Sequence, residues 1–210
     1  MGDMFPEPFT DSMLVYDLED GSWDSVRIPI ESLRKGTAGL FNVIDVTVCV
    51  SGDKLALLVT GDSQADRSKQ VSVYATLDAE GNWQPVGWSD SFAGAFGMPT
   101  FAADDAGALY LFGGTSIDSK GAAHASNMVS RVSVLQDGRL AVEPVSELKI
   151  PRAAPRVSYG DGVYVVSAGV GGPGGSSWEG VGNLEIVNLS TGSTVVDMAP
   201  YIGATTAFTF

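Results

Sequence analysis

The stretch "ALYLFGGT" (Ala108–Thr115) is a short alternating apolar run that ends in two glycines. Two similar stretches flank it, "KLALLVTG" (Lys54–Gly61) and "GVYVVSAG" (Gly162–Gly169). Aligned on their second residues, Leu55, Leu109 and Val163, the three follow one another at a spacing of 54 residues. A fixed period of this size is the signature of a repeat architecture, in which each repeat is one supersecondary unit.

Each repeat also contains three further segments that alternate between apolar and polar residues, separated by tight-turn signals such as Asp-Gly and Gly-Asn. The unit is therefore four strands, which we name a to d in chain order. A four-stranded sheet of about 50 residues cannot bury both faces alone, and stacking against its neighbours gives a propeller. We expect strands a to d at Asn42–Val50, Leu55–Gly61, Gln70–Leu77 and Trp83–Trp88, then Pro99–Ala103, Leu109–Gly114, Val129–Leu135 and Leu140–Val145, then Pro155–Tyr159, Val163–Ala168, Leu184–Leu189 and Thr194–Met198.

The predicted fold class is all-β, a propeller with four-stranded antiparallel blades at 42–88, 98–146 and 152–199. Residues 12–28 supply strands c and d of an earlier blade, and 203–210 supply the start of a later one. We treat 1–210 as a single partial propeller with about three complete blades and two partial ones.

Several segments carry a family resemblance: "LYLFGG" (Leu109–Gly114), "VYDLEDGSW" (Val15–Trp23), "VYATLDAEGNW" (Val73–Trp83) and "IPRAAPRVSY" (Ile150–Tyr159). They resemble kelch-repeat propellers, with the galactose-oxidase-like propeller as the broader kin. In that family the two glycines end strand b, and a tyrosine and a tryptophan mark strands c and d. Only the middle blade keeps both glycines, whose places we assign to Val59-Thr60 and Ser167-Ala168 in the other two blades.

The resemblance implies a ring of five to seven blades, which needs a longer chain. We therefore expect a part of a larger propeller, either a trimmed piece or a protomer that a second copy completes. Unpaired blade faces and strand edges are otherwise left open.

The bulk composition narrows the class of protein. With 44% hydrophobic and 18% charged residues, the chain has a globular composition. The formal net charge of −13 disfavours nucleic acid and anionic lipid as partners. Cys49 is the single cysteine, so no intrachain disulfide or cysteine-based metal site can form, and we expect a buried, unreactive thiol. No apolar run is long enough to span a bilayer, and the first residues do not form a signal peptide.

The connections between the strands differ in length in a regular way. All a–b and c–d connections are short, whereas all b–c and d–a connections are long. In a four-strand meander the b–c and d–a loops leave the sheet on one face, so the long loops gather around the central channel. We call this the long-loop face, and because rigid scaffolds carry binding residues on such loops, we predict a ligand site there.

The candidate residues on this face are aromatic, acidic or basic. Trp178 and Glu179 lie in the third b–c loop, and Trp88 lies at the first d–a loop. Arg152 and Arg156 either bind a carboxylate or tie a strand to a neighbouring blade. The full set of candidate ligand-binding residues is Trp178, Glu179, Asp62, Arg67, His124, Trp88, Arg152 and Arg156.

We predict no catalytic residues, no metal and no cofactor. The loop "GDSQADR" (Gly61–Arg67) lacks the glycine and the final glutamate of an EF-hand. His124 is the one histidine, and the copper site that the resemblance to galactose oxidase suggests needs at least two. Gly169, Gly171 and Gly174 match the G-x-G-x-x-G pattern, but a strand follows instead of the helix that a dinucleotide site requires.

The leading hypothesis is a non-enzymatic binding module that holds a protein or a glycan. One alternative is a fragment of a carbohydrate-acting propeller enzyme, similar to the kelch-type sialic acid epimerases, which would bury Arg152, Arg156 and a carboxylate together at the channel mouth. Another is a structural spacer of a bacterial surface protein. The lysine-poor, small-residue-rich composition fits a secreted or cell-surface bacterial location, and Asn188–Ser190 forms a glycosylation sequon that matters only in a eukaryotic secretory pathway.

Overall fold

The computed structural model describes residues 12–29, 41–63, 70–89, 98–117, 122–171 and 179–196, and this part of the chain is all-β with no helix. Within it, no helix of the length and hydrophobicity needed to cross a membrane occurs. Three four-stranded antiparallel sheets dominate, which confirms the predicted blade-like units. Two short two-stranded sheets accompany them.

The strands follow the chain in simple meanders. The first sheet holds β3 (Phe41–Ser51), β4 (Lys54–Ser63), β5 (Gln70–Leu77) and β6 (Trp83–Ser89). The second sheet holds β7 (Thr100–Ala103), β8 (Leu109–Phe112), β11 (Met128–Val134) and β12 (Leu140–Glu147). The third sheet holds β13 (Arg156–Gly160), β14 (Val163–Ser167), β15 (Leu184–Asn188) and β16 (Gly192–Val196). The two-stranded sheets are β1 (Ser12–Tyr16) with β2 (Trp23–Arg27), and β9 (Thr115–Ile117) with β10 (Ala123–Ala125).

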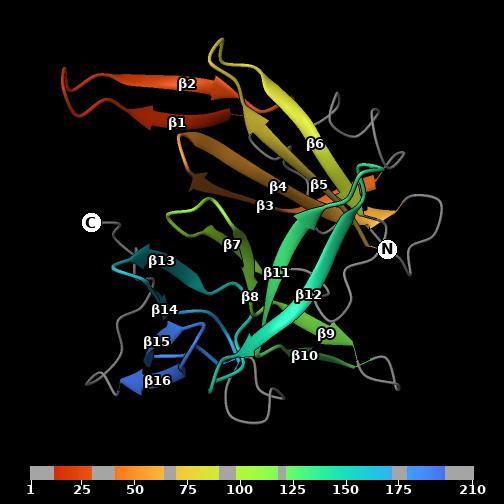
Figure 1. Cartoon of the computed structure of the whole chain (residues 1–210), viewed down its shortest axis with the longest axis vertical. Coiled ribbons are helices and arrows are strands. Elements are labelled where there is room, and N and C mark those ends of the chain that lie inside the picture. The colour runs from red at the N-terminus through yellow and green to blue at the C-terminus, as the bar shows by residue number, and fades with distance from the viewer. Residues whose placement is uncertain are drawn as a thin grey trace.

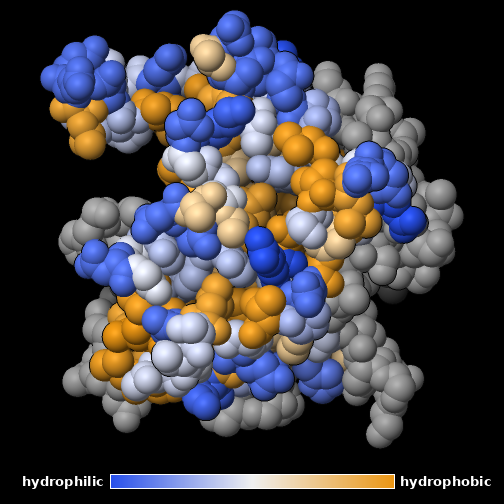
Figure 2. All heavy atoms as spheres, in the orientation of Figure 1, coloured by the Kyte–Doolittle hydropathy of each residue, from blue (hydrophilic) through white to orange (hydrophobic). Residues whose placement is uncertain are grey.

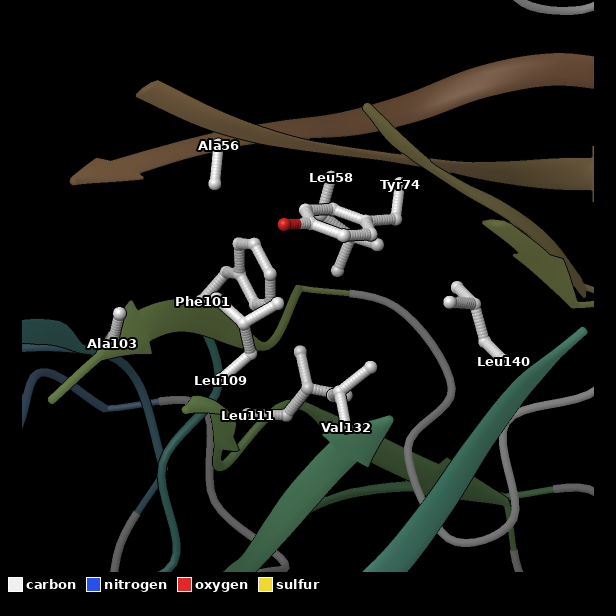
Figure 3. Packing of buried hydrophobic residues seen from close by; sticks show 9 residues of the cluster. All are labelled: Ala56, Leu58, Tyr74, Phe101, Ala103, Leu109, Leu111, Val132 and Leu140. Carbon is white, nitrogen blue, oxygen red and sulfur yellow. The ribbon is translucent and has the colours of Figure 1, made fainter. Parts of the chain in front are cut away.

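Alternating side chains give each sheet two apolar faces. In β4, Leu57 and Val59 lie in one buried cluster, and Leu58 lies in another on the opposite face. The second cluster fills the space between the first and second sheets, where Leu58 and Tyr74 meet Phe101 (Figure 3). Because both faces of the first sheet are covered, Leu55–Val59 of β4 is a continuous apolar run and does not alternate with polar residues.

The sheets are stacked one after another. Figure 1 shows the β1–β2 hairpin, the first sheet, the second sheet and the third sheet in order from top to bottom. The innermost strands β3, β7 and β13 are neighbours: the Thr47 hydroxyl donates to the Pro99 carbonyl, and the Thr100 hydroxyl donates to the Pro155 carbonyl. At the turn end, the Ser51 hydroxyl donates to the Gly107 carbonyl at 3.1 Å. This arrangement is consistent with a propeller-like fold, and the described sheets do not close into a ring.

The register predicted for the third blade is wrong by one residue. Gly113 and Gly114 have φ of 65° and 99°, and the matching left-handed pair after β14 is Ala168 and Gly169, with φ of 53° and 89°. The pair is therefore not Ser167-Ala168, and the second and third b strands are 55 residues apart. A one-residue shift moves every side chain of a strand to the other face. The partner strands set the register: Tyr159 pairs with Tyr164 and turns its ring toward the second sheet.

Several predicted boundaries also differ. β4 extends to Ser63, beyond the predicted end at Gly61. The second b–c connection, predicted as a loop, contains the β9–β10 hairpin. β16 begins at Gly192 instead of Thr194, and its predicted end at Met198 lies outside the described residues, as does the strand predicted at 203–210.

Trp23 and Trp83, the tryptophans of the two Tyr–Trp segments, differ in burial. Trp83 is buried in the cluster on the first sheet, with 5% of its surface exposed. Trp23 is 67% exposed and contacts Tyr16 at a ring-centroid distance of 4.8 Å. The β1–β2 hairpin packs on the first sheet through Met13 and Val26, so residues on its other face stay open.

Candidate functional site

A hollow of about 1020 Å³ lies between the innermost strands β3, β7 and β13. Its walls are mostly apolar side chains, such as Val48, Leu55 and Phe101, with a few hydroxyl-bearing side chains between them. Charged residues stand at its rims. The polar lining consists of Thr47, Thr100, Ser158, Arg156, Asp104, Asp105 and Asp161.

The charges of the hollow are separated along the strands. Asp104, Asp105 and Asp161 follow the last residues of β7 and β13 in the short a–b turns. Arg156 is the first residue of β13 and so lies toward the long-loop end. The hollow therefore has an acidic rim at the turn end and a cation at the long-loop end.

Arg152 holds the long loops of the second and third sheets together. Its guanidinium donates to the carbonyls of Ala168 at 3.1 Å and Asn183 at 2.8 Å. Its backbone carbonyl accepts from the N–H of Gly114, and its own N–H donates to the carbonyl of Ser126. One residue thus joins the d–a connection after β12 to both b–c connections beside it.

The charge of Arg152 is compensated inside the protein. Its side chain is fully buried and lies 3.7 Å from the Glu185 carboxylate, which is also fully buried. Burial lowers the pKa of Arg152, and the Glu185 carboxylate partly offsets that change. The same carboxylate accepts from the N–H groups of Lys149 and Ile150. These contacts match the second of the two predicted roles, in which the arginine ties neighbouring blades.

Arg156 has a different environment. It is exposed, lines the hollow and pairs with Ser167 of β14 across the sheet. The structure therefore does not bury Arg152 and Arg156 with one carboxylate, which is the arrangement expected of an enzyme. Among the described residues, no group of three histidine, cysteine or acidic side chains gathers in a geometry that could hold a metal ion.

Two further candidates lie on the long-loop side. Glu179 is exposed, and its backbone carbonyl accepts from the N–H of Gly171 at 2.8 Å. His124 lies in β10 rather than in a loop, half-buried and opposite Ser116 of β9. The isolated bridges of Val170 to Ala153 and to Gly180 connect this region to the d–a connection.

The remaining candidates are placed elsewhere. Asp62 lies within β4, paired with Gln70, and not in the b–c loop. Trp88 lies in β6, and its N–H donates to the carbonyl of Gly138 in the c–d turn of the second sheet. This contact brings the long-loop end of the first sheet's outer strand against a short turn of the second sheet, as the twist of the sheets allows. At the outer strands, the long loops and the short turns are therefore not on fully separate faces. Arg67 and Trp178 lie outside the described residues.

The sequence did not point to the acidic rim or to the tyrosines beside it. Asp104 and Asp105 looked like an ordinary turn, and only the neighbouring sheets bring Asp161 near them. Tyr164 is buried against the rings of Tyr110 and Tyr159, and burial together with the nearby Asp104 raises its pKa. No short-range pattern signals such a cluster, because its members come from two separate hairpins, β7–β8 and β13–β14.

Cys49 lines the hollow and is partly buried. Burial raises the pKa of its thiol to about 12. The thiolate is the reactive form of cysteine, so this side chain is unreactive near neutral pH, in line with the expectation from the sequence.

Comparison with known proteins supports the fold. No family model matches the chain, and no curated protein matches it. Its structure is similar to a solved one titled "Structure of YjhT". The TM-score is 0.53 and the sequences are 14% identical, over 89% of this chain and 51% of that chain. The chain thus spans about half of the length of that protein. At this identity the likeness supports the propeller-like all-β fold alone.

Proposed function

We propose that this chain is a kelch-type propeller segment that acts as a non-enzymatic binding module. Its ligand, a glycan or a protein, binds on the long-loop face at the mouth of the hollow. The observation that carries this proposal is the network of Arg152, which fastens three long connections to one another. Loops fixed in this way present a pre-organised surface, and pre-organisation lowers the entropic cost of binding.

The side chains at this face suit a ligand with hydroxyl or carboxylate groups. Arg156 offers a forked set of donors at the long-loop end of the hollow, and the hydroxyls of Thr100 and Ser158 line the wall beside it. Glu179 and Trp178 extend the proposed site along the third b–c loop. An aromatic face beside acidic and hydroxyl groups is a common setting for sugar rings and for protein side chains.

The enzyme alternative has no comparable support. Arg152 and Glu185 are fully buried and lie 3.7 Å apart as an ion pair, and neither side chain lines the hollow. The spacer alternative differs from the binding module in one respect, since a spacer has no ligand on this face.

Export to a bacterial surface remains part of the proposal and fits either of these two roles.

Two screens test the proposal. The labelled chain is applied to a glycan array and, as immobilised bait, to surface and secreted proteins of the source. The ligand found is then titrated against Arg156→Ala and the double variant Trp178→Ala/Glu179→Ala. We expect each to weaken binding about tenfold or more, which corresponds to about 1.4 kcal/mol or more.

Asp137→Ala, in the exposed c–d turn of the second sheet, is the matched control and should bind as the parent chain does. A ligand that binds all variants equally would refute the proposed site. Failure of both screens would favour the spacer.

A further inference from the structure

The third sheet has an apolar face that no other described sheet covers. Tyr164, Val166 and Val187 point toward the second sheet. By the alternation of strands, the residues between them point the other way. Figure 2 shows hydrophobic residues gathered over the third sheet, at the lower left of the view. The positions on this open face include Arg156, Ser158, Val163, Val165, Leu184, Ile186, Thr194 and Val196, and Arg156, at the long-loop end, is the one charged residue among them.

The same positions are buried in the other two sheets. The left-handed pairs after β8 and β14 align Val165 of β14 with Tyr110 of β8, and Ala56 of β4 lies on the corresponding face of the first sheet. Tyr110 is 9% exposed and Ala56 is 0% exposed, because the following sheet covers each of them. In contrast, Ile186 and Val196 of the third sheet are 37% and 39% exposed. The open face thus repeats a packing surface whose next layer is missing from the described chain.

The other end of the stack has a complementary open face. The β1–β2 hairpin turns Met13 and Val26 toward the first sheet. Leu14, Tyr16 and Trp23 alternate with them and are 70%, 46% and 67% exposed. Among the described residues, β2 is the one strand that pairs with β1. Exposed apolar patches of this kind mark interaction surfaces.

We propose that a second copy of this chain covers both faces. The open face of the third sheet in one copy packs on the β1–β2 hairpin of the other, and the reverse contact closes the pair. This inference concerns assembly and holds whether or not the proposed ligand site is correct. Two copies related by one two-fold axis then form a closed ring with two identical contacts and no open face.

The direction of the stack supports this pairing. Along the chain, each sheet offers its later face to the earlier face of the next. The third sheet has a free later face and the hairpin has a free earlier face, so a head-to-tail contact continues the existing order. The length of the chain fits as well. Since 89% of it matches 51% of the YjhT chain, two copies together have about the length of one YjhT chain.

The composition of the two faces favours close packing. Trp and Tyr are the residues that most often dominate interface energies. None of the positions named on either face is acidic. The net charge of −13 makes the two copies repel each other, but the acidic residues responsible lie outside the proposed contact. Salt screens that repulsion, and the dimer should therefore strengthen as ionic strength rises.

Light scattering after size-exclusion chromatography of the full 210-residue chain tests the inference. We expect the parent chain to have twice the mass of one chain at micromolar concentration. Ile186→Lys on the third sheet and Leu14→Lys on the hairpin should each yield a monomer with an unchanged circular dichroism spectrum. The matched control is Val145→Lys on β12, where the side chain is 40% exposed but lies on neither open face, and it should stay dimeric.

Mixing the two monomeric variants tests the head-to-tail order. In a mixed pair, the unaltered hairpin of Ile186→Lys meets the unaltered third sheet of Leu14→Lys, so one of the two contacts is intact. We expect dimer to reappear partially in the mixture. A monomeric parent chain would overturn the proposal, as would a dimer that survives both substitutions, open polymers in place of a dimer, or a mixture that stays monomeric.

Discussion

Arg152 is the residue on which the long-loop face depends most. Its guanidinium has two backbone carbonyls and one carboxylate as partners, and its backbone joins two further connections. Each partner comes from a segment that does not pack a large apolar core of its own. The geometry of this face therefore rests on a polar network, and such networks are costly when one member is removed.

Replacing Arg152 by alanine should destabilise the fold by about 3–5 kcal/mol, because the Glu185 carboxylate then stays buried without its cation. Urea denaturation followed by circular dichroism measures this change. Arg156→Ala is the control: that side chain is exposed, and its loss should change the free energy of unfolding by less than about 0.5 kcal/mol. Equal losses for both variants would show that Arg152 does not hold the loops.

Cys49 gives a test of the packing around the hollow. With its pKa raised to about 12, the native thiol holds very little thiolate between pH 7 and 9, so it should react with iodoacetamide much more slowly than an ordinary thiol at every pH in that range, although its rate rises with pH. In urea the same thiol should react faster as the pH approaches the ordinary value of 9.0.

The sign for stability follows from the same pKa. Above pH 9 the unfolded thiol loses its proton while the native one keeps it, so stability should fall as the pH rises from 9 toward 12. A native thiol that labels as fast as the denatured one would contradict the burial of Cys49.

At the scale of strands and turns, the left-handed pairs after β8 and β14 bring the second and third sheets close to the connection between them. Gly113 approaches the Arg152 carbonyl so closely that an added Cβ would lie 2.2 Å from its oxygen. Gly169 is similarly close to the Ala153 carbonyl, at 2.8 Å. These positions let the backbone of one sheet touch the connection that leads to its neighbour.

Gly113→Ala should therefore lower the free energy of unfolding by more than the strain of an alanine in the left-handed conformation. The backbone term is about 1–2 kcal/mol, and the overlap with the Arg152 carbonyl adds about 1–3 kcal/mol. Gly138→Ala is the matched control, since it has φ of 80° and nothing within 4 Å of the added Cβ, so it should show the backbone term alone. Thermal melting of both variants compares them, and equal shifts would mean that the close approach is unimportant.

The same elements show what the sequence could and could not predict. Alternation and turn residues predicted the four-strand meanders, because both are local properties. The period alone misplaced the left-handed pair after β14, since the alternation of that strand fits either register. Tyr159, which pairs with Tyr164, is what decides between them. The β9–β10 hairpin was missed because its three-residue strands, as in Thr115–Ile117, are too short for a periodic signal.

For the whole molecule, the stack of sheets explains both the hollow and the open faces. Strands β3, β7 and β13 line one side of the hollow, with Arg156 toward one end and the acidic turns at the other. The long b–c and d–a connections of the second and third sheets are tied together at the Arg156 end. Loop length predicted the general location of the candidate site. The role of Arg152 could not be predicted because it depends on contacts between sheets, and that of Asp62 because it depends on where β4 ends.

The polarity of the hollow predicts how binding depends on charge. Arg156→Glu places a carboxylate where the proposed ligand meets a cation, so binding should weaken more than in Arg156→Ala. A shift of at least a further tenfold in Kd, measured by calorimetry with the screened ligand, is expected if that ligand carries a carboxylate. Ser158→Ala removes one hydroxyl and should have a smaller effect, of about threefold to tenfold. Tighter binding by Arg156→Glu would show that the ligand meets a different charge.

Hydrogen exchange of the full chain, with and without the screened ligand, tests the central claim most directly. Binding on the long-loop face should slow exchange at the amides of 152–154, 168–171 and 179–183, and leave the a–b turns at 52–53, 104–107 and 161–162 unchanged. Protection confined to those turns, or to the exposed strands β6, β12 and β16, would contradict the account.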